Sequence, residues 1–346
     1  LVLFVLGLLV SFSGLSQVPK ERNQENINVN KFRPLHQELS SPNMFRTASG
    51  APGPAYYQQQ ADYKMDIELD DENKRVYGSE TITYTNNSPD NLEYLWVQLD
   101  QNIRKKDSPS LLIDEGGVSP AYAPSGFTKE FLTDPFDGGF NIEYVLDGNK
   151  KPLKHFVNQT MMRVDLPSVL KSGESFSFSI KWWYNIQDHV NQDGRSGYES
   201  FDKDGNRVYI IAQFFPRMAV YNEVEGWQNY QFWGDGEFAL PFGNYDVKIT
   251  VPSDHILDAT GELQNRKSVF SKEMIKRYNK AKKTYDKPVM IVTQAEAEEV
   301  EKGFSKKKKT WHFVAENVRD FAFATSRKFI WDMMAVKIGD KDVMAV

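Results

Sequence analysis

Apolar and polar residues alternate along the chain with a period of two. In residues 61–70 an apolar side chain stands at every second position, from Tyr63 to Leu69, and charged residues separate them. This pattern is typical of a strand with one buried face. Turn-forming residues follow, and the ranges 76–84 and 92–99 are predicted to be the next two strands. We expect these three strands to form a β meander.

The same period recurs downstream, most cleanly in residues 175–184, where large apolar side chains stand between serines and a lysine. Residues 202–206 read Asp-Lys-Asp-Gly-Asn, and they favour a hairpin turn over a calcium loop, because their Gly is not at the EF-hand position. We therefore predict a mainly β protein: a saddle-shaped or sandwich-like, multi-stranded antiparallel domain with a small helical insertion. Further strands are expected at 141–146, 162–166, 198–201, 208–212, 242–252, 310–315 and 321–325.

The helical insertion is expected at residues 264–309. Within it, 271–285 has apolar residues at helical spacing among many lysines. Residues 289–292 predict a short strand. Thr293 stands three residues before Glu296, which is the capping-box spacing at the start of a helix.

The chain begins with ten residues of which all but Gly7 are apolar, too few for a membrane-spanning helix of ~20 residues. Small residues at Gly14 and Ser16 predict a signal peptide over 1–16, cleaved before Gln17. We therefore expect an exported protein, periplasmic or extracellular, without a membrane span after cleavage. Residues 17–60 are polar and lack a sustained period, so they are expected to be an exposed lead-in segment.

Composition narrows the possible partners. The net charge of the 346-residue chain is −5, which gives no overall basic field for nucleic acid. An exported chain could carry disulfides, but this one has no cysteine, so its stability must come from its core. An aromatic content of 13% suits large β surfaces and argues against disorder.

Metal-dependent hydrolysis has no recognisable motif in the chain. A zinc peptidase motif of the form His-Glu-x-x-His places two histidines one helical turn apart. No histidine here is followed by Glu, and no two lie four positions apart; the five are His36, His155, His189, His255 and His312. A nucleophilic serine motif is also missing. We therefore expect no catalytic and no metal-binding residue in this chain.

The block from Ala212 to Tyr221 reads Ala-Gln-Phe-Phe-Pro-Arg-Met-Ala-Val-Tyr, a buried strand that Pro216 interrupts. Together with the strand at 242–252 and the sequence Ala-Thr-Gly-Glu-Leu ending at Leu263, it resembles the amino-terminal β domain of the aminopeptidase N-like zinc metallopeptidases, the gluzincins that include leukotriene hydrolase. The resemblance extends over residues 61–346.

The resemblance implies a β domain over 61–335, with 336–346 as the start of a catalytic domain that continues beyond the chain and binds the zinc cofactor. In this family a loop of the β domain closes one end of the substrate groove. The third residue of its Gln-Phe-Glu-Pro type motif holds the free amine of the peptide. The matching stretch here runs from Gln213 to Pro216, so Gln213 and Phe215 are the candidate substrate-binding residues.

Phe215 replaces the usual acid or amide of the motif, and a phenyl ring offers an amine only a cation–π face. Two alternatives follow: Gln213 substitutes as the acceptor, or the substrate preference differs from that of ordinary aminopeptidases. Phe215→Glu is expected to restore the usual acceptor.

Two functions remain open at this stage. The first is the amino-terminal part of an exported zinc-dependent aminopeptidase, with peptide substrates and its own catalytic domain as partners. The full-length protein would be the enzyme, and the chain alone would be inactive. The alternative is a non-catalytic, β-rich binding or scaffold module for a peptide, a glycan or a protein partner.

Overall fold

The computed structural model describes residues 42–110, 121, 123–128, 132, 136–190, 194, 196–234 and 239–346. The predicted signal peptide and most of the lead-in segment therefore lie outside the described residues. The chain divides into two units, Leu1–Tyr56 and Tyr57–Val346. In the first unit, a bridge joins Arg46 and Pro52, and the Arg46 guanidinium lies 5.3 Å from the centre of the Tyr56 ring.

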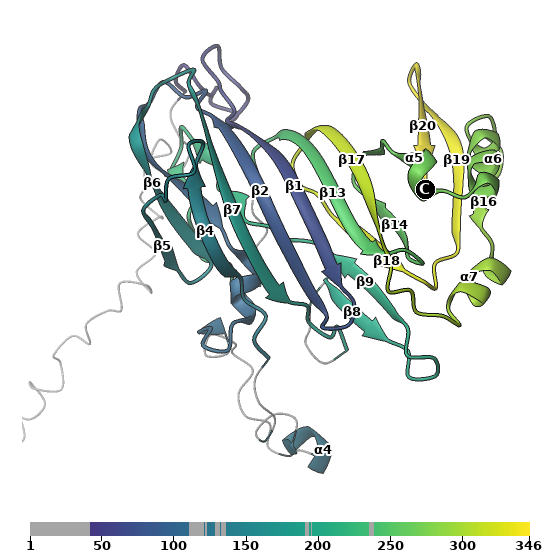
Figure 1. Ribbon diagram of the computed structural model, residues 1–346. Coiled ribbons are helices and arrows are strands. Elements are labelled where there is room, and N and C mark those ends of the chain that lie inside the picture. The colour runs from purple at the N-terminus through teal and green to yellow at the C-terminus, as the bar shows by residue number, and fades with distance from the viewer. Residues whose placement is uncertain are drawn as a thin grey trace, which may run out of the picture. The chain divides into compact units, whose positions relative to one another are not determined.

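The second unit is built on a seven-stranded sheet in the order β15-β17-β13-β1-β2-β7-β4 (Figure 1). Neighbouring strands are antiparallel except β1 and β13, which pair in parallel. The prediction of a mainly β fold with antiparallel sheets is confirmed, with this one parallel pair as an addition. The strands are Gln60–Asp70 (β1), Arg75–Thr85 (β2), Asn141–Asp147 (β4), Ser175–Asn185 (β7), Gly243–Pro252 (β13), Glu262–Leu263 (β15) and Lys308–Val318 (β17).

The parallel pair depends on a glycine. A Cβ atom at Gly243 would lie 1.6 Å from the carbonyl oxygen of Ala61, closer than any side chain permits. Only glycine lets β13 start this close to β1. The alternation predicted for residues 61–70 is also confirmed, because Tyr63, Met65, Ile67 and Leu69 are all buried.

A four-stranded sheet, β10-β3-β6-β5, corrects the predicted meander. The strands are Arg217–Met218 (β10), Leu92–Gln98 (β3), Met161–Leu170 (β6) and His155–Asn158 (β5). The third predicted strand, β3, does not pair with β2 but with β6 and β10. The reason lies in the connection, where the buried Asn86 amide donates to the carbonyls of Asp90 and of Leu170 in β6. The segment that looked like a tight turn therefore crosses from one sheet to the other.

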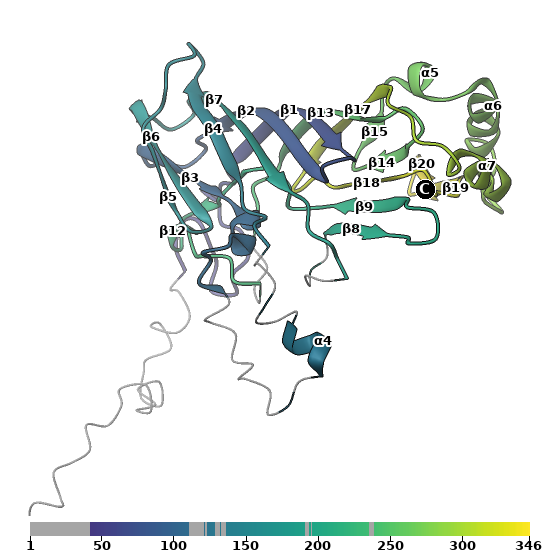
Figure 2. The same ribbon diagram turned by 60° about the horizontal axis from the view of Figure 1, so that its bottom comes forward.

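A second four-stranded sheet has the order β14-β18-β9-β8, and Figure 2 shows its strands running beside the large sheet. The predicted hairpin is confirmed, since β8 pairs with β9 across the turn that contains Gly205 at φ +72°. Asp204 in this turn is held by Lys328. The strands are Gly197–Ser200 (β8), Arg207–Ile211 (β9), Ile256–Ala259 (β14) and Phe323–Ser326 (β18), and a small ribbon pairs Tyr221–Asn222 (β11) with Gly226–Trp227 (β12).

The helical insertion is confirmed, including the capping box in which Thr293 and Glu296 bond each other's backbone. Its strand β16 joins a three-stranded sheet, β16-β19-β20. Strand β19 runs through residue 336 without a break and turns back into β20. The elements are Arg266–Val269 (α5), Lys272–Ala281 (α6), Val289–Val292 (β16), Gln294–Val300 (α7), Trp331–Ile338 (β19) and Lys341–Ala345 (β20); a 3-10 helix at Asp100–Arg104 and α4 (Pro124–Phe127) lie earlier in the chain.

Aromatic side chains form the contacts between the sheets. Trp182 of β7 packs edge-on against Phe140 and Phe214, with ring centres 5.4 and 6.4 Å apart. Phe214 in turn packs edge-on against Phe323 of β18 at 5.2 Å. Gly78 of β2 stands opposite Trp182, and a Cβ atom there would lie 2.2 Å from the indole ring. The core is therefore continuous from the large sheet to β18.

One carboxylic acid stands inside this core. Glu80 of β2 is 2% exposed and lies between Met65 and Ile180 in the register of the sheet. Neither of its carboxyl oxygens has a hydrogen-bond partner among the described residues. Burial therefore raises its pKa well above the ordinary range, and the group is favoured in its neutral form.

We predict that Glu80→Gln stabilises the protein at neutral pH. The unfolded chain releases the Glu80 proton near the ordinary pKa of 4.5, whereas the folded chain keeps it to a higher pH. Wild-type stability should thus fall relative to the variant by about 1.4 kcal/mol per pH unit as pH rises above that ordinary pKa, up to the folded-state pKa.

Chemical denaturation at several pH values measures this difference. The exposed Glu93→Gln on β3 is the control and should show no such trend. Identical pH dependence for wild type and Glu80→Gln would show that Glu80 is not held neutral.

Candidate functional site

The loop from Gln213 to Tyr221 begins where β9 ends at Ile211. Gln213 adopts φ +52°, a left-handed conformation that is uncommon outside glycine. Gln101 of the 3-10 helix fixes this conformation, because its side-chain nitrogen donates to the Gln213 carbonyl at 3.0 Å. Pro216, which cannot donate a backbone hydrogen bond, follows three residues later. The sequence-predicted strand end is therefore a sharp and anchored turn.

The two phenylalanines after Gln213 point into the core. Phe215 is 0% exposed and packs edge-on against Tyr63 at 5.4 Å and against Tyr245 at 6.0 Å between ring centres. Tyr63 and Tyr245 are themselves stacked at 4.7 Å. A glutamate at position 215 would thus be buried among rings. An unpaired carboxylate there would cost folding energy, so Phe215→Glu is expected to destabilise the protein.

The Gln213 side chain differs from its neighbours. It is only partly buried, and its amide makes no hydrogen bond within the described part of the chain. The structure thus separates the two candidate residues. The Gln213 amide is available to bind a ligand, while the Phe215 ring packs in the core beneath the turn.

Arg217 anchors the other end of the turn. Its Nε and one terminal nitrogen donate to a single Asp100 oxygen at 3.1 and 2.8 Å, and its other terminal nitrogen donates to Asp320 at 2.7 Å. Arg217 and Asp100 are buried, whereas Asp320 is partly exposed.

Burial alone would lower the pKa of Arg217, but the two carboxylates outweigh it and hold the pKa above its ordinary value. Burial likewise raises the pKa of Asp100 against the pull of Arg217. Because the guanidinium stays charged and donates twice to Asp100, we assign the pair as ionic at neutral pH.

A second charged cluster, which the sequence did not reveal, lies at the β1–β2 turn. Arg327 bridges Asp71 at 2.8 Å and Asp254 at 2.9 Å, and the Tyr209 hydroxyl donates to Asp71 at 2.7 Å. Burial lowers the pKa of the adjacent His255 to about 4, so this ring is neutral at physiological pH. These bonds link the residues next to β14 and β18 to the β1–β2 turn.

The described histidines do not converge. His255 bonds Thr325, His312 bonds Asp246 and His155 bonds the Leu153 carbonyl. Within the described ranges, no group of three or more His, Cys, Asp or Glu residues could hold a metal ion. These residues do not fit a zinc site, and His36 lies outside the described part. Nor is any helix of the described chain both long and apolar enough to cross a membrane.

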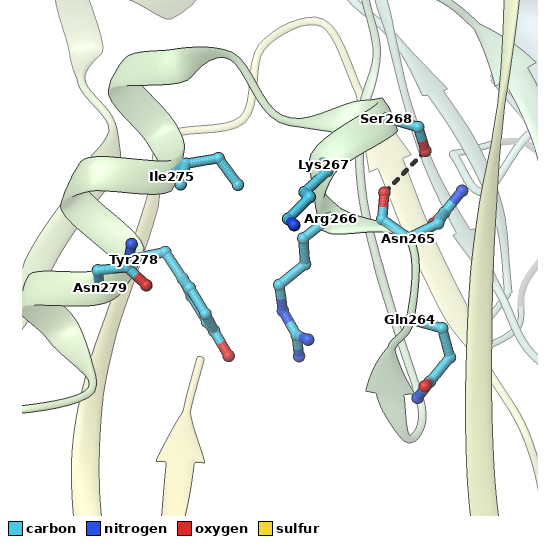
Figure 3. Close-up of a pocket in the computed structure, with 8 residues that line it drawn as sticks. All are labelled: Gln264, Asn265, Arg266, Lys267, Ser268, Ile275, Tyr278 and Asn279. Atoms are coloured by element: carbon cyan, nitrogen blue, oxygen red, sulfur yellow. Dashed lines mark hydrogen bonds between the residues drawn. The ribbon is translucent and has the colours of Figure 1, made fainter.

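Two hollows lie around α5 and α6. The first has a volume of about 570 Å³ and lies between these helices (Figure 3); it is lined by Gln264, Asn265, Arg266, Lys267, Ser268, Ile275, Tyr278 and Asn279. The second, of about 430 Å³, borders β14, β15 and the β19–β20 hairpin, and in it burial raises the pKa of Asp258 to about 6. The first hollow was not predicted from the sequence.

Comparison with known proteins gives structural matches only. No family model and no curated protein matches the chain. Among solved structures, an M1 zinc metallopeptidase from Deinococcus radiodurans matches with a TM-score of 0.40 and 12% identity, over 83% of this chain and 46% of that chain. A mutant of that protein bound to a Tyr-Ser-Ala substrate matches with a TM-score of 0.42 and 11% identity, over 83% and 46%. This chain thus spans about half the length of those proteins, and at such TM-scores the likeness assigns it no activity.

We predict that Gln213→Gly keeps or raises stability, by up to ~1 kcal/mol, because glycine adopts positive φ without strain. Gln213→Val should destabilise, since a β-branched side chain disfavours this conformation. The matched control is Lys276→Gly, at an exposed position in the middle of α6, where glycine should cost ~1 kcal/mol. Denaturant midpoints measure all three. A loss for Gln213→Gly equal to that of the control would show that Gln213 does not adopt positive φ.

Proposed function

We propose that this chain is the amino-terminal part of an exported zinc-dependent aminopeptidase, which removes amino-terminal residues from peptides. The observation that carries the proposal is the anchored turn at Gln213, which leaves the Gln213 amide without a hydrogen bond in the described structure, two residues before the position where the resembling family binds the substrate's amine. The partners of the chain are then a peptide substrate and its own catalytic domain.

Gln213 has the chemistry for this role. Its amide oxygen is an acceptor, and a peptide's terminal ammonium group is a donor, so the two form a charge-assisted hydrogen bond. Gln101 and the rings around Phe215 hold the backbone of the turn, so the residue that carries the acceptor is in place before substrate arrives. Such preorganisation lowers the entropy lost on binding.

In the part of the chain that the structure describes, no group of residues is suited to hold the metal. When bound by the catalytic domain, zinc would supply an activated water for peptide hydrolysis. This chain would contribute the substrate-facing wall and the orientation of the amino terminus. Export follows from the predicted signal peptide at residues 1–16.

The alternative function is a non-catalytic binding or scaffold module for a peptide, a glycan or a protein partner. The hollow between α5 and α6 favours it. This hollow lies in the helical insertion, and none of its lining residues belongs to the Gln213 turn. The two functions are compatible in one protein, since they use different residues.

We predict that Gln213→Ala in the protein encoded by the complete gene lowers kcat/KM for aminoacyl substrates about ten- to a hundredfold. This corresponds to the ~1.5–3 kcal/mol of a hydrogen bond to a charged group. Steady-state hydrolysis of aminoacyl anilides measures it, and an N-acetylated peptide, which lacks the ammonium group, should not respond.

Gln294→Ala on the exposed helix α7 is the matched control and should leave turnover unchanged. If Gln213→Ala equals wild type on free and blocked peptides alike, Gln213 does not bind the amine. If the complete protein hydrolyses no peptide under any metal condition, the peptidase proposal itself is contradicted and the binding module is favoured.

A further inference from the structure

Positive charge is concentrated in one short segment of this acidic chain. Residues 264–287 contain nine basic and two acidic side chains, a net charge of +7. Because the whole chain carries −5, the remaining residues carry −12. The segment corresponds to α5, α6 and the turn that follows α6.

The lysines of α6 form a ridge that other side chains do not neutralise. The helix buries Met274, Tyr278 and Ala281. The lysine ridge consists of Lys272, Lys276 and Lys280, which lie four residues apart on its exposed side, and of Lys283 in the turn that follows the helix. In the described structure the ion pairs of this segment involve its two arginines, Arg266 and Arg277, and none of the ridge lysines.

This arrangement is costly for the helix itself. Like charges three or four residues apart repel each other on a helix surface. A bound anion would remove that repulsion. The lysine ridge is thus better suited to an anionic ligand than to solvent alone.

A concave site adjoins the ridge. Figure 3 shows the Arg266 and Lys267 side chains projecting into the space between α5 and α6. Amide and hydroxyl groups surround this space. Those of Asn265 and Ser268 already bond protein atoms, whereas the Gln264 side-chain oxygen and the Asn279 amide have no hydrogen-bond partner among the described residues. No acidic residue lines the space, although Glu262 pairs with Arg266 at its edge. The hollow of about 570 Å³ therefore combines positive charge with groups that bond hydroxyls.

These features distinguish among classes of anion. Binding single-stranded nucleic acid requires exposed rings for base stacking, but Tyr278, the ring that lines the hollow, is 9% exposed and is covered by Arg266 and Lys282. Tyr285 of the same segment is exposed but does not line the hollow. A bilayer surface requires large apolar residues on the exposed face of the helix, where α6 presents lysines, an asparagine and Glu273. Amides beside lysines match a ligand that carries both hydroxyl and acidic groups.

We propose that the hollow between α5 and α6 and the adjoining lysine ridge bind an acidic oligosaccharide. Its sulfate or carboxylate groups contact the lysines and Arg266, and its hydroxyl groups bond the amides of the hollow. This inference does not depend on the peptidase proposal, because binding is measured without turnover.

The test is calorimetric titration of the full chain with a sulfated heparin hexasaccharide as the probe and neutral maltohexaose as its uncharged counterpart. We expect binding of the sulfated probe only, with an affinity that falls as salt rises, because bound counterions are released. A phosphatidylglycerol vesicle and a DNA duplex are titrated in parallel.

Two sets of variants locate the site. Replacing three ridge lysines together (Lys276→Gln, Lys280→Gln and Lys283→Gln) should weaken hexasaccharide binding at least about tenfold. The control has the same charge change elsewhere: Lys150→Gln, Lys151→Gln and Lys171→Gln, which are exposed and lie outside the segment. Asn279→Leu fills the hollow without changing charge and should weaken binding severalfold at unchanged salt dependence.

Thermal melts confirm that the variants are folded. No binding of the hexasaccharide, equal losses in the ridge and control triples, or wild-type affinity in Asn279→Leu would each overturn the proposal. Tighter binding of the vesicle or of the DNA than of the hexasaccharide would do the same, since the site would then serve another class of anion.

Discussion

The buried ion pair between Arg217 and Asp100 is the constraint on which the rest of the central region depends. It joins β10 to the 3-10 helix that follows β3, two segments 117 residues apart in the sequence. A buried charge without a partner costs several kcal/mol, so each member requires the other in place. Asp320 extends the pair to the segment that leads into β18.

The aromatic core around this pair gives the Gln213 turn its shape. Tyr63 connects the two, because its ring packs against Phe215 and its hydroxyl accepts from the backbone nitrogen of Met218. The turn is thus held by Gln101, by Tyr63 and by Arg217, which come from different elements. These contacts fix the backbone from which the Gln213 side chain projects, and a substrate-orienting residue needs such a rigid support.

The sequence predicted those features that depend on neighbouring residues. The period-two strands, the hairpin at Gly205 and the capping box at Thr293 are local patterns, and the structure confirms them. The meander was wrong because the turn at Asn86 is determined by a bond to Leu170, which no local pattern reveals. The burial of Phe215 and the ion pairs of Arg217 and Arg327 depend on distant segments in the same way. The net charge of residues 264–287 can be counted from the sequence. Which of their lysines lack an ion-pair partner becomes known only from the structure.

A double-mutant cycle on Arg217 and Asp100 tests this account most directly. Unfolding free energies are measured for Arg217→Met, for Asp100→Asn and for the two combined. Each substitution at Arg217 or Asp100 alone should destabilise, and Arg217→Met by ~3–5 kcal/mol, because it leaves a buried carboxylate without its cation. The account predicts a coupling energy of at least ~2 kcal/mol, with the double variant more stable than the sum of the single losses implies. Additive losses, or a stable Arg217→Met, would show that the region does not depend on this pair.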